Sequence, residues 1–310
     1  MEVVAVTGGT GFIGSRLVEL LAARAETEIR LLVRQASARS RPENVLPVAG
    51  DAVESASLRR LLVPGCMLIN LVHLDARSRT DNTEFAKTVL SACAAASVTH
   101  LVHCSTATVV GRTPGDVINE NTTCMPGNEY EATKLAVERV FLEQGPQNLG
   151  VSILRPTAVF GPGGKNLIKL ADDLFRQSRI LNYAKSSLYG NRRMNLVHVD
   201  NVAAALAFLA DRQHQIRKRI YLVSDDEHSS NNYRDVEKRL MKAFCVPDYP
   251  IPPLPMPRFV LAAAMRIAGR SNTNPDRVYD SAKLRNAGLK KPMPFEEGLE
   301  DFIRWYLRRP

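Results

Sequence analysis

The stretch VVAVTGGTGFIGSRLVELLAAR, residues 3–24, decides the fold. Residues 3–6 are a short β-branched run that predicts a buried strand, and apolar residues within 12–24 recur at the spacing of an amphipathic helix. Gly8, Gly11 and Gly14 lie at the end of this strand and the start of this helix. The sequence therefore predicts a strand, a glycine-rich turn and a helix, in that order.

The three glycines have separate physical uses. The first permits a tight turn, the second lets the backbone approach a pyrophosphate, and the third lets the helix pack closely on the strand. The helix N-terminus then presents unpaired N–H groups to the anion. Because the turn belongs to the first strand–helix unit, it predicts dinucleotide binding, with a purely structural turn as the alternative. The cofactor-binding residues expected here are Gly8, Thr10, Gly11, Phe12, Ile13 and Gly14.

The end of the second expected strand indicates which dinucleotide is bound. A carboxylate at this place accepts a hydrogen bond from the ribose of NAD, whereas an arginine pairs with the 2′-phosphate of NADP. Arg34 occupies the place, Arg39 and Arg41 follow, and no acidic residue lies between Glu28 and Glu43. We expect NADP, because a guanidinium pairs with phosphate through charge-assisted hydrogen bonds, and NAD remains the alternative.

Strand and helix patterns alternate along the rest of the chain, which predicts an α/β fold with a Rossmann doubly wound parallel sheet. After residue 224 the pattern changes to a polar turn, a helix and a proline-rich connector. We expect an NAD(P)-binding domain made of residues 1–164 and 190–224, and a smaller C-terminal substrate-binding lobe made of 165–189 and 225–310. Strands are expected at 29–33, 67–72, 99–104, 151–154, 196–199 and 221–223, and helices at 83–96, 129–142, 167–177, 202–209 and 233–244.

Charge and composition narrow the class of partner. The 310 residues carry a formal net charge of +9, and 11 Lys and Arg against six acids fall in the last sixty residues. The excess favours anionic partners. Basic residues are otherwise scattered and aromatic residues make up only 6% of the chain, so we expect no nucleic-acid partner. Charge alone does not choose among such partners; two pyrophosphates, one on a cofactor and one on a substrate, become the expected ones through the family resemblance given below.

Cysteine usage and hydropathy bear on the compartment. Five cysteines form no C-x-x-C pair, which favours reduced thiols over disulfides or a zinc site. No run approaches the roughly 18 apolar residues of a membrane span. The apolar segment 259–269 is shorter and contains Arg266, so it predicts a buried or interfacial helix. We expect a cytoplasmic protein with no metal and no membrane span.

A tyrosine and a lysine indicate the chemistry. Tyr130 and Lys134 share a helix face, because residues four apart lie one turn above each other. A nearby cation favours the phenolate and lowers the tyrosine pKa, so that the phenol exchanges protons with an alcohol or carbonyl. Ser105 and Thr106 end the strand at 99–104 and offer hydroxyls to the same oxygen, and successive residues of a strand point to opposite sides.

Together these motifs resemble the extended short-chain dehydrogenase/reductase family, the NAD(P)-dependent epimerase/dehydratase group, over essentially the whole chain. The resemblance implies that Tyr130, Lys134 and Thr106 are catalytic, with Ser105 as the alternative hydroxyl. It also implies that Lys134 binds the nicotinamide ribose. The matches, in order, are TGGTGFIG at 7–14, LINLVHLDA at 68–76, CSTATVVG at 104–111, YEATK at 130–134 and ILRPTAVFGPG at 153–163.

The resemblance extends to binding residues and substrate. For the cofactor it implies Asp51, Ala52, Leu71, Val72, His73, Lys134, Pro156 and Val159, and for the substrate Thr106, Asn166, Arg192 and Arg193. Family members most often act on nucleotide sugars, and this chain is similar to 4-keto-sugar reductases of polysaccharide synthesis and to UDP-sugar 4-epimerases. A hydroxysteroid- or flavonoid-type ketone reductase and a non-catalytic NADP-binding protein are the alternatives.

Three positions depart from the family pattern. The arginine that many relatives use against the substrate pyrophosphate aligns near Met194, beside Arg192 and Arg193. Asn201 stands where aspartate is usual, and Val110 where tyrosine is frequent. These departures affect which substrate we expect more than which reaction we expect. The resemblance also implies a homodimer that pairs through the helix containing residues 84–96 and the Tyr130 helix.

Overall fold

A seven-stranded parallel sheet forms the centre of the molecule. The computed structural model describes residues 2–35, 41–75, 77–190, 192–211, 218–254, 256–267, 269 and 271–309. The strand order is β10-β7-β5-β4-β1-β2-β3, and all neighbours pair in parallel. The chain leaves β1 toward β2 on one side and later returns to β4 on the other, which makes the end of β1 the switch point where ligands bind. The strands are β1 (Glu2–Thr7), β2 (Thr27–Val33), β3 (Val45–Ala49), β4 (Met67–Asn70), β5 (His100–Cys104), β7 (Gly150–Pro156) and β10 (Lys218–Val223).

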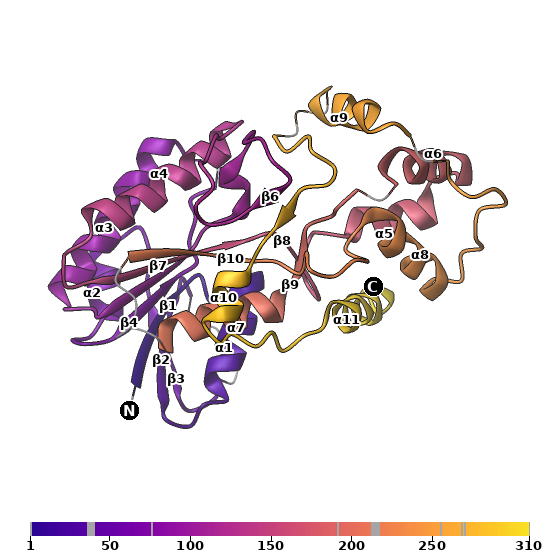
Figure 1. Ribbon diagram of the computed structural model, residues 1–310. Coiled ribbons are helices and arrows are strands. Elements are labelled where there is room, and N and C mark those ends of the chain that lie inside the picture. The colour runs from indigo at the N-terminus through magenta and orange to yellow at the C-terminus, as the bar shows by residue number, and fades with distance from the viewer. Residues whose placement is uncertain are drawn as a thin grey trace.

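Helices cover both faces of this sheet, as Figure 1 shows. On one face lie α1 (Phe12–Ala22) and α7 (Val199–Asp211), which share an apolar core with the strands. On the other face lie α2 (Ser55–Leu61), α3 (Arg79–Ala95) and α4 (Glu129–Gln144), with a second core. Because both faces are covered, the strands read as continuous apolar runs. The predicted α/β, doubly wound Rossmann sheet is confirmed.

One expected strand has a different partner. The apolar run at 196–199 predicted a further member of the alternating sheet, but β9 (Leu196–His198) pairs with β8 (Ala158–Phe160) in a separate two-stranded sheet. The short run has no feature that selects its partner, and the β8 segment follows β7 immediately after Thr157. The pair therefore leads the chain away from the main sheet.

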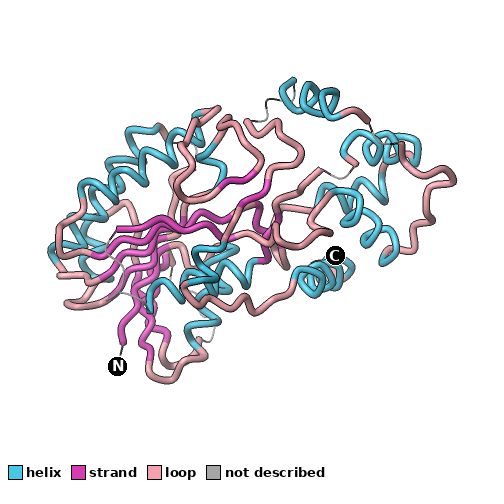
Figure 2. Tube along the Cα trace, viewed as in Figure 1, coloured by secondary structure: helices cyan, strands magenta, loops and turns pink. Residues whose placement is uncertain are grey.

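A second group of helices lies beyond the carboxyl ends of the strands (Figure 2). It consists of α5 (Ile168–Arg176), α6 (Arg179–Tyr189), α8 (Tyr233–Ala243) and α11 (Phe295–Leu307). A third apolar core joins α5, α8 and α11 to β8 and β9, with Phe302 fully buried in it. The helix α9 (Arg258–Ile267) lies at the rim of this group beside α6.

The last segment of the chain returns to the nucleotide-binding sheet before it reaches α11. The strand β11 (Val278–Tyr279) pairs with β6 (Val117–Ile118), and α10 (Ala282–Asn286) places Leu284 in the core beside α7. The 3-10 turn η1 (Ala107–Val110) packs near this pair. The boundary between the two domains expected from the sequence stays a prediction. Part of 225–310 packs on elements of the first expected domain.

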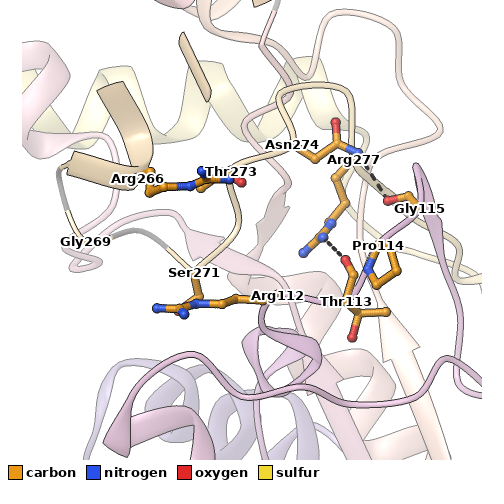
Figure 3. A pocket seen from close by; sticks show the side chains of 10 residues that line it. All are labelled: Arg112, Thr113, Pro114, Gly115, Arg266, Gly269, Ser271, Thr273, Asn274 and Arg277. Carbon is orange, nitrogen blue, oxygen red and sulfur yellow. Dashed lines mark hydrogen bonds between the residues drawn. The ribbon is translucent and has the colours of Figure 1, made fainter. Parts of the chain in front are cut away.

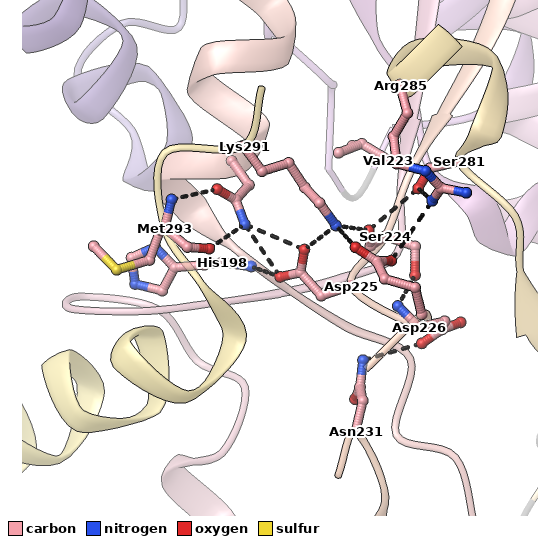
Figure 4. Close-up of polar contacts among 12 residues, drawn as sticks. His198, Val223, Ser224, Asp225, Asp226, Asn231, Ser281, Arg285, Lys291 and Met293 are labelled. Atoms are coloured by element: carbon pink, nitrogen blue, oxygen red, sulfur yellow. Dashed lines mark hydrogen bonds and ion pairs between the residues drawn. The ribbon is translucent and has the colours of Figure 1, made fainter. Parts of the chain in front are cut away.

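A buried polar cluster connects α7, the turn after β10 and the segment before α11 through hydrogen bonds (Figure 4). Asn201 of α7 donates to the carboxylate of Asp225 at 3.2 Å and to the carbonyl of Met293 at 2.8 Å, and its own oxygen accepts from the Met293 N–H at 3.0 Å. Lys291 donates to Asp225 at 2.7 Å, and the His198 N–H donates to Asp225 at 3.0 Å. The cluster ties α7, the turn after β10 and the segment before α11 into one unit.

Candidate functional site

The glycine turn has the geometry that its sequence predicts. Gly8 has a φ of 74°, a conformation that glycine adopts without strain. A Cβ on Gly14 would lie 2.2 Å from the carbonyl oxygen of Gly8, so only glycine permits this approach of α1 to the turn. Gly11 is the N-cap of α1, and no side chain caps the helix or puts a carboxylate in its first turn. The free N–H groups suit a phosphate anion.

A pocket of about 620 Å³ opens beside this turn and contains seven of the residues expected to bind the cofactor. Arg34 lies exposed at the end of β2, on the same wall as Asp51. The volume of the pocket and the arginine in its wall suit the adenosine half of a dinucleotide. The expected residues in the lining are Gly8, Thr10, Arg34, Asp51, Ala52, Val72 and His73.

The other expected cofactor residues lie around this pocket. Phe12 and Ile13 begin α1, and Leu71 packs directly against Gly8. Pro156 is the buried last residue of β7, and Val159 lies half-buried on β8. Arg39 and Ala76, which the sequence also singled out, lie outside the described residues.

Tyr130 reaches the same edge of the sheet from the first turn of α4. Its side chain is 49% exposed, and its ring meets that of His73 edge to face, with centroids 5.5 Å apart. Since His73 lines the cofactor pocket, the phenol borders the place where a nicotinamide would lie. Lys134, one turn later, is buried, and its ammonium donates to the carbonyl of Cys104 at 3.2 Å.

The titration of this pair differs from the expectation. Partial burial removes water from the Tyr130 phenol and raises its pKa above the ordinary value, and the electrostatic effects of Cys104 and Asp75 raise this pKa further. Burial lowers the pKa of Lys134, although Cys104 partly offsets this. The ammonium is held by the Cys104 carbonyl, and the net effect on the phenol is a raised pKa. The phenol is therefore a protonated donor at neutral pH, suited to protonate a carbonyl oxygen.

The two hydroxyls after β5 point to different environments. Ser105 is buried, and its hydroxyl donates to the carboxylate of Glu138, which also pairs with Arg155 at 2.6 Å. Thr106 is half-buried, and its hydroxyl oxygen accepts from the Thr108 N–H at 3.2 Å at the start of η1. Thr106 thus lies at the open end of the strand, while Ser105 belongs to an internal ion-pair network.

A polar chain inside the sheet supports the pocket, and the sequence did not predict it. The hydroxyl of Thr7 donates to the Asn70 side chain at 2.7 Å, and Asn70 donates to Nδ1 of His103 at 3.2 Å. Burial holds the pKa of His103 well below its ordinary value, so the ring stays neutral and accepts this bond. The Val72 N–H donates to the Asn70 oxygen at 3.2 Å, which fixes the backbone that lines the cofactor pocket.

A second pocket, of about 380 Å³, contains three arginines, Arg112, Arg266 and Arg277 (Figure 3). Arg277 is only 3% exposed, and its guanidinium donates to the carbonyls of Gly111, at 2.8 Å, and Thr113. Its Nε is buried and has no hydrogen-bond partner among the described residues. The pocket therefore concentrates positive charge with little compensation by carboxylates in its lining.

A smaller cavity of about 190 Å³ adjoins this arginine pocket through Ser271, which lines both. Thr108, Thr157 and Arg192 also line the smaller cavity. Thr108, two residues after Thr106, and Thr157 closely follow the ends of β5 and β7, so the cavity lies at the carboxyl edge of the sheet. Of the arginines expected at the substrate, Arg192 is thus placed in a cavity.

Two other expected substrate residues make internal contacts. Arg193 donates to the carbonyls of His228 and Ser229 at 3.1 and 3.3 Å. Asn166 is exposed and donates to the carbonyl of Val159 at 2.7 Å, so it holds the turn after β8. Neither residue lines the arginine pocket or the cavity beside it.

The parallel sheet, the glycine turn and the tyrosine–lysine pair define a Rossmann-type dinucleotide-binding protein. The chain belongs to the NAD dependent epimerase/dehydratase family, whose model matches residues 4–224. This is a family of enzymes. No helix within the described ranges has the length and apolar character of a membrane span.

Two individual relatives match this chain at low sequence identity. The chain is 30% identical to sterol demethylase protein B of Methylococcus capsulatus over 51% of each chain. It is 27% identical to 2-alkyl-3-oxoalkanoate reductase of Stenotrophomonas maltophilia over 67% of this chain and 65% of that protein. The chain thus spans only half to two thirds of these relatives.

A solved structure agrees over the full length. The dTDP-glucose 4,6-dehydratase of Bacillus anthracis, in complex with NAD, superposes with a TM-score of 0.73 and 17% identity, covering 100% of this chain and 97% of that one. At this identity the likeness establishes the fold alone.

Proposed function

We propose that this chain is an NADP(H)-dependent oxidoreductase or epimerase that transfers hydride at carbon 4 of a nucleotide sugar. The observation that carries the proposal is the arginine pocket, which adjoins the small cavity near Thr106 at the carboxyl edge of the sheet. Two or three guanidinium groups around one space suit a diphosphate, because each binds phosphate through charge-assisted hydrogen bonds. The solved dTDP-glucose 4,6-dehydratase, which shares the fold, supports the same class of substrate.

In this proposal the residues at the carboxyl edge divide the chemistry. Tyr130 donates a proton to the substrate carbonyl in reduction, and the phenolate that remains accepts a proton from the substrate hydroxyl in oxidation. Thr106 orients the same oxygen through its hydroxyl, and Lys134 binds the nicotinamide ribose. The bound nicotinamide supplies or accepts the hydride.

The binding residues fit the same scheme. The uncapped start of α1 holds the cofactor pyrophosphate, and Arg34 pairs with the 2′-phosphate that distinguishes NADP from NAD. Arg192 and the arginine pocket hold the substrate. A homodimer through α3 and α4, which lie side by side in Figure 1, completes the proposal on the resemblance to the family, and a cytoplasmic location completes it on the cysteine usage.

A second candidate is a reductase of an apolar ketone. The relative that supports it is the 2-alkyl-3-oxoalkanoate reductase, at 27% identity. The same tyrosine, lysine and threonine would act on such a ketone, and the arginine pocket would then take a carboxylate or remain outside the reaction.

The test compares the two classes of substrate in one assay. NADPH is mixed with the protein and either a UDP-4-keto-6-deoxy sugar or a long-chain 3-oxo acid, and loss of the reduced nicotinamide absorbance is followed. We expect turnover of the nucleotide sugar, and Arg112→Gln raises its KM on the order of tenfold with a small change in kcat. Arg59→Gln, an exposed arginine on α2, is the matched control and leaves both constants unchanged.

The outcomes separate the candidates. Turnover of the oxo acid alone favours the ketone reductase, and no turnover of either class supports a non-catalytic NADP-binding protein. Cofactor retention separates reductase from epimerase. An epimerase regenerates its NAD within one turnover and keeps it bound, whereas a reductase releases NADP each cycle. Stoichiometric NAD(H) in the purified protein therefore contradicts both the reductase and the NADP preference.

A further inference from the structure

Many exposed apolar side chains belong to the helices that lie beyond the carboxyl ends of the strands, and to the segment that connects two of them. Half of the large apolar side chains that the described residues expose belong to α6, α9 and the proline-rich connector between α8 and α9. We call this surface the α6/α9 face. Its apolar members are Ile180, Leu181, Ile251, Leu254, Met256, Phe259 and Ile267.

Hydrogen bonds make the connector continuous with α6. Arg179 donates to the carbonyl of Asp248 at 2.7 Å, and one turn later the Tyr183 hydroxyl donates to the carbonyl of Pro252 at 3.4 Å. After another turn, the Met256 N–H donates to the carbonyl of Ser187 at 3.4 Å. The connector thus runs along α6, and its exposed Ile251 and Leu254 lie between these contacts.

The helix α9 is apolar on two opposite sides. Leu261 and Met265, one turn apart, are 4% and 3% exposed and face the protein. Phe259 and Ile267, two turns apart on the other side, are 74% and 90% exposed. A helix that only packs on the protein needs one apolar side, so the outer one is available to an apolar partner.

Charge indicates the kind of partner. The connector carries one charged residue, Asp248, whereas residues 258–270 contain three arginines and no aspartate or glutamate, so α9 is cationic as well as apolar. Arg179, at the start of α6, and Arg266, on α9, are exposed next to the apolar side chains. Apolar and cationic groups together match the acyl boundary and headgroups of an anionic bilayer, whereas a second copy of this cationic face would repel it.

We propose that the α6/α9 face docks on the surface of an anionic lipid bilayer, with α9 lying in the interface. Phe259 and Ile267 enter the acyl boundary, and the exposed Arg179 and Arg266 face the headgroups. The helix has only ten residues, so it lies on the membrane and does not cross it. Arg266 also lines the arginine pocket, so docking places this pocket at the bilayer surface.

The experiment measures co-sedimentation with vesicles. Phosphatidylcholine vesicles are compared with vesicles that also contain phosphatidylserine. We expect the wild-type chain to sediment with the anionic vesicles, and Phe259→Glu/Ile267→Glu to lose at least about tenfold in partitioning. Leu307→Glu, at a residue 55% exposed on α11, is the control and sediments like the wild type. Unchanged NADPH binding shows that each variant is folded.

A second double variant leaves α9 unchanged and tests the same surface if Phe259→Glu/Ile267→Glu fails to fold. Ile251→Ser/Leu254→Ser alters the connector alone and also lowers partitioning. Absence of sedimentation with anionic vesicles overturns the proposal, and so does equal sedimentation of the wild type and both pairs. A wild-type oligomer that dissociates in Phe259→Glu/Ile267→Glu, without vesicle binding, assigns the face to a second copy of the chain and overturns it too.

Discussion

Asn201→Asp tests how the two parts of the molecule are joined. Asn201 is completely buried, and its amide donates to the carboxylate of Asp225 and to the carbonyl of Met293. Aspartate has the same shape, but its ionised form donates nothing and lies against a second buried carboxylate. Two lost hydrogen bonds and one uncompensated buried charge together cost about 3–5 kcal/mol in the free energy of unfolding. The Lys291 ammonium already binds the carboxylate of Asp225, so its single charge does not also neutralise the carboxylate introduced at residue 201.

Urea unfolding measures this cost, with Trp305 of α11, the chain's one tryptophan, as the fluorescent probe. Asn119→Asp is the matched control, because the exposed Asn119 side chain only accepts hydrogen bonds, from the Asn121 N–H and Thr122 hydroxyl, and a carboxylate also accepts them. The cost of Asn201→Asp also shrinks as the pH falls, because the introduced carboxyl group regains a donor and loses its charge when it is protonated. A cost equal to that of the control, or one independent of pH, refutes the reasoning.

Three further predictions concern the site and its surroundings. Ser105→Ala lowers the free energy of unfolding by about 1–3 kcal/mol with little change in kcat, whereas Thr106→Ala lowers kcat with little change in stability; the reverse pattern makes Ser105 the catalytic hydroxyl. Burial raises the pKa of Asp226 from 3.8 to about 6. Between these two pH values the folded chain holds a proton that the unfolded chain has released, so the free energy of unfolding falls as the pH rises through this range. Relative to Asp226→Asn, the wild type therefore loses about 3 kcal/mol between acidic and neutral pH, and a constant difference in urea unfolding contradicts the shift. Arg34→Asp weakens NADPH binding much more than NADH binding by fluorescence titration, and equal weakening shows that Arg34 does not contact the phosphate.

The parts of the fold that depend on local pattern were predictable. Gly8 and Gly14 have local reasons to be glycine, a left-handed turn and a close helix contact, and both appear in the sequence as spacing. Long apolar runs predicted the strands, because strands covered on both faces carry little polarity. The helix α6 was not predicted, because its buried side is Asn182, Ser186 and Ser187 and has no apolar period.

The arginine pocket could not be predicted, since it joins segments far apart in the chain. Arg112 follows η1, Arg266 ends α9 and Arg277 precedes β11. No spacing rule connects these positions, and the only signal was the basic excess of the last sixty residues. Adjacent positions were equally ambiguous: Arg192 lines a cavity, whereas Arg193 binds backbone carbonyls. The motifs indicate the edge of the sheet where the reaction takes place, whereas tertiary packing decides which of two neighbouring residues reaches that edge.

The central claim is that Tyr130, beside His73 and the cofactor pocket, moves the proton that accompanies hydride transfer. Tyr130→Phe keeps the ring and its contact with His73 and removes only the hydroxyl. The most direct measurement is kcat for NADPH oxidation by wild type and variant on the preferred substrate, with NADPH affinity measured separately. We predict a fall in kcat of about 10²–10⁴ with unchanged NADPH affinity. A variant that retains the wild-type kcat would contradict the account.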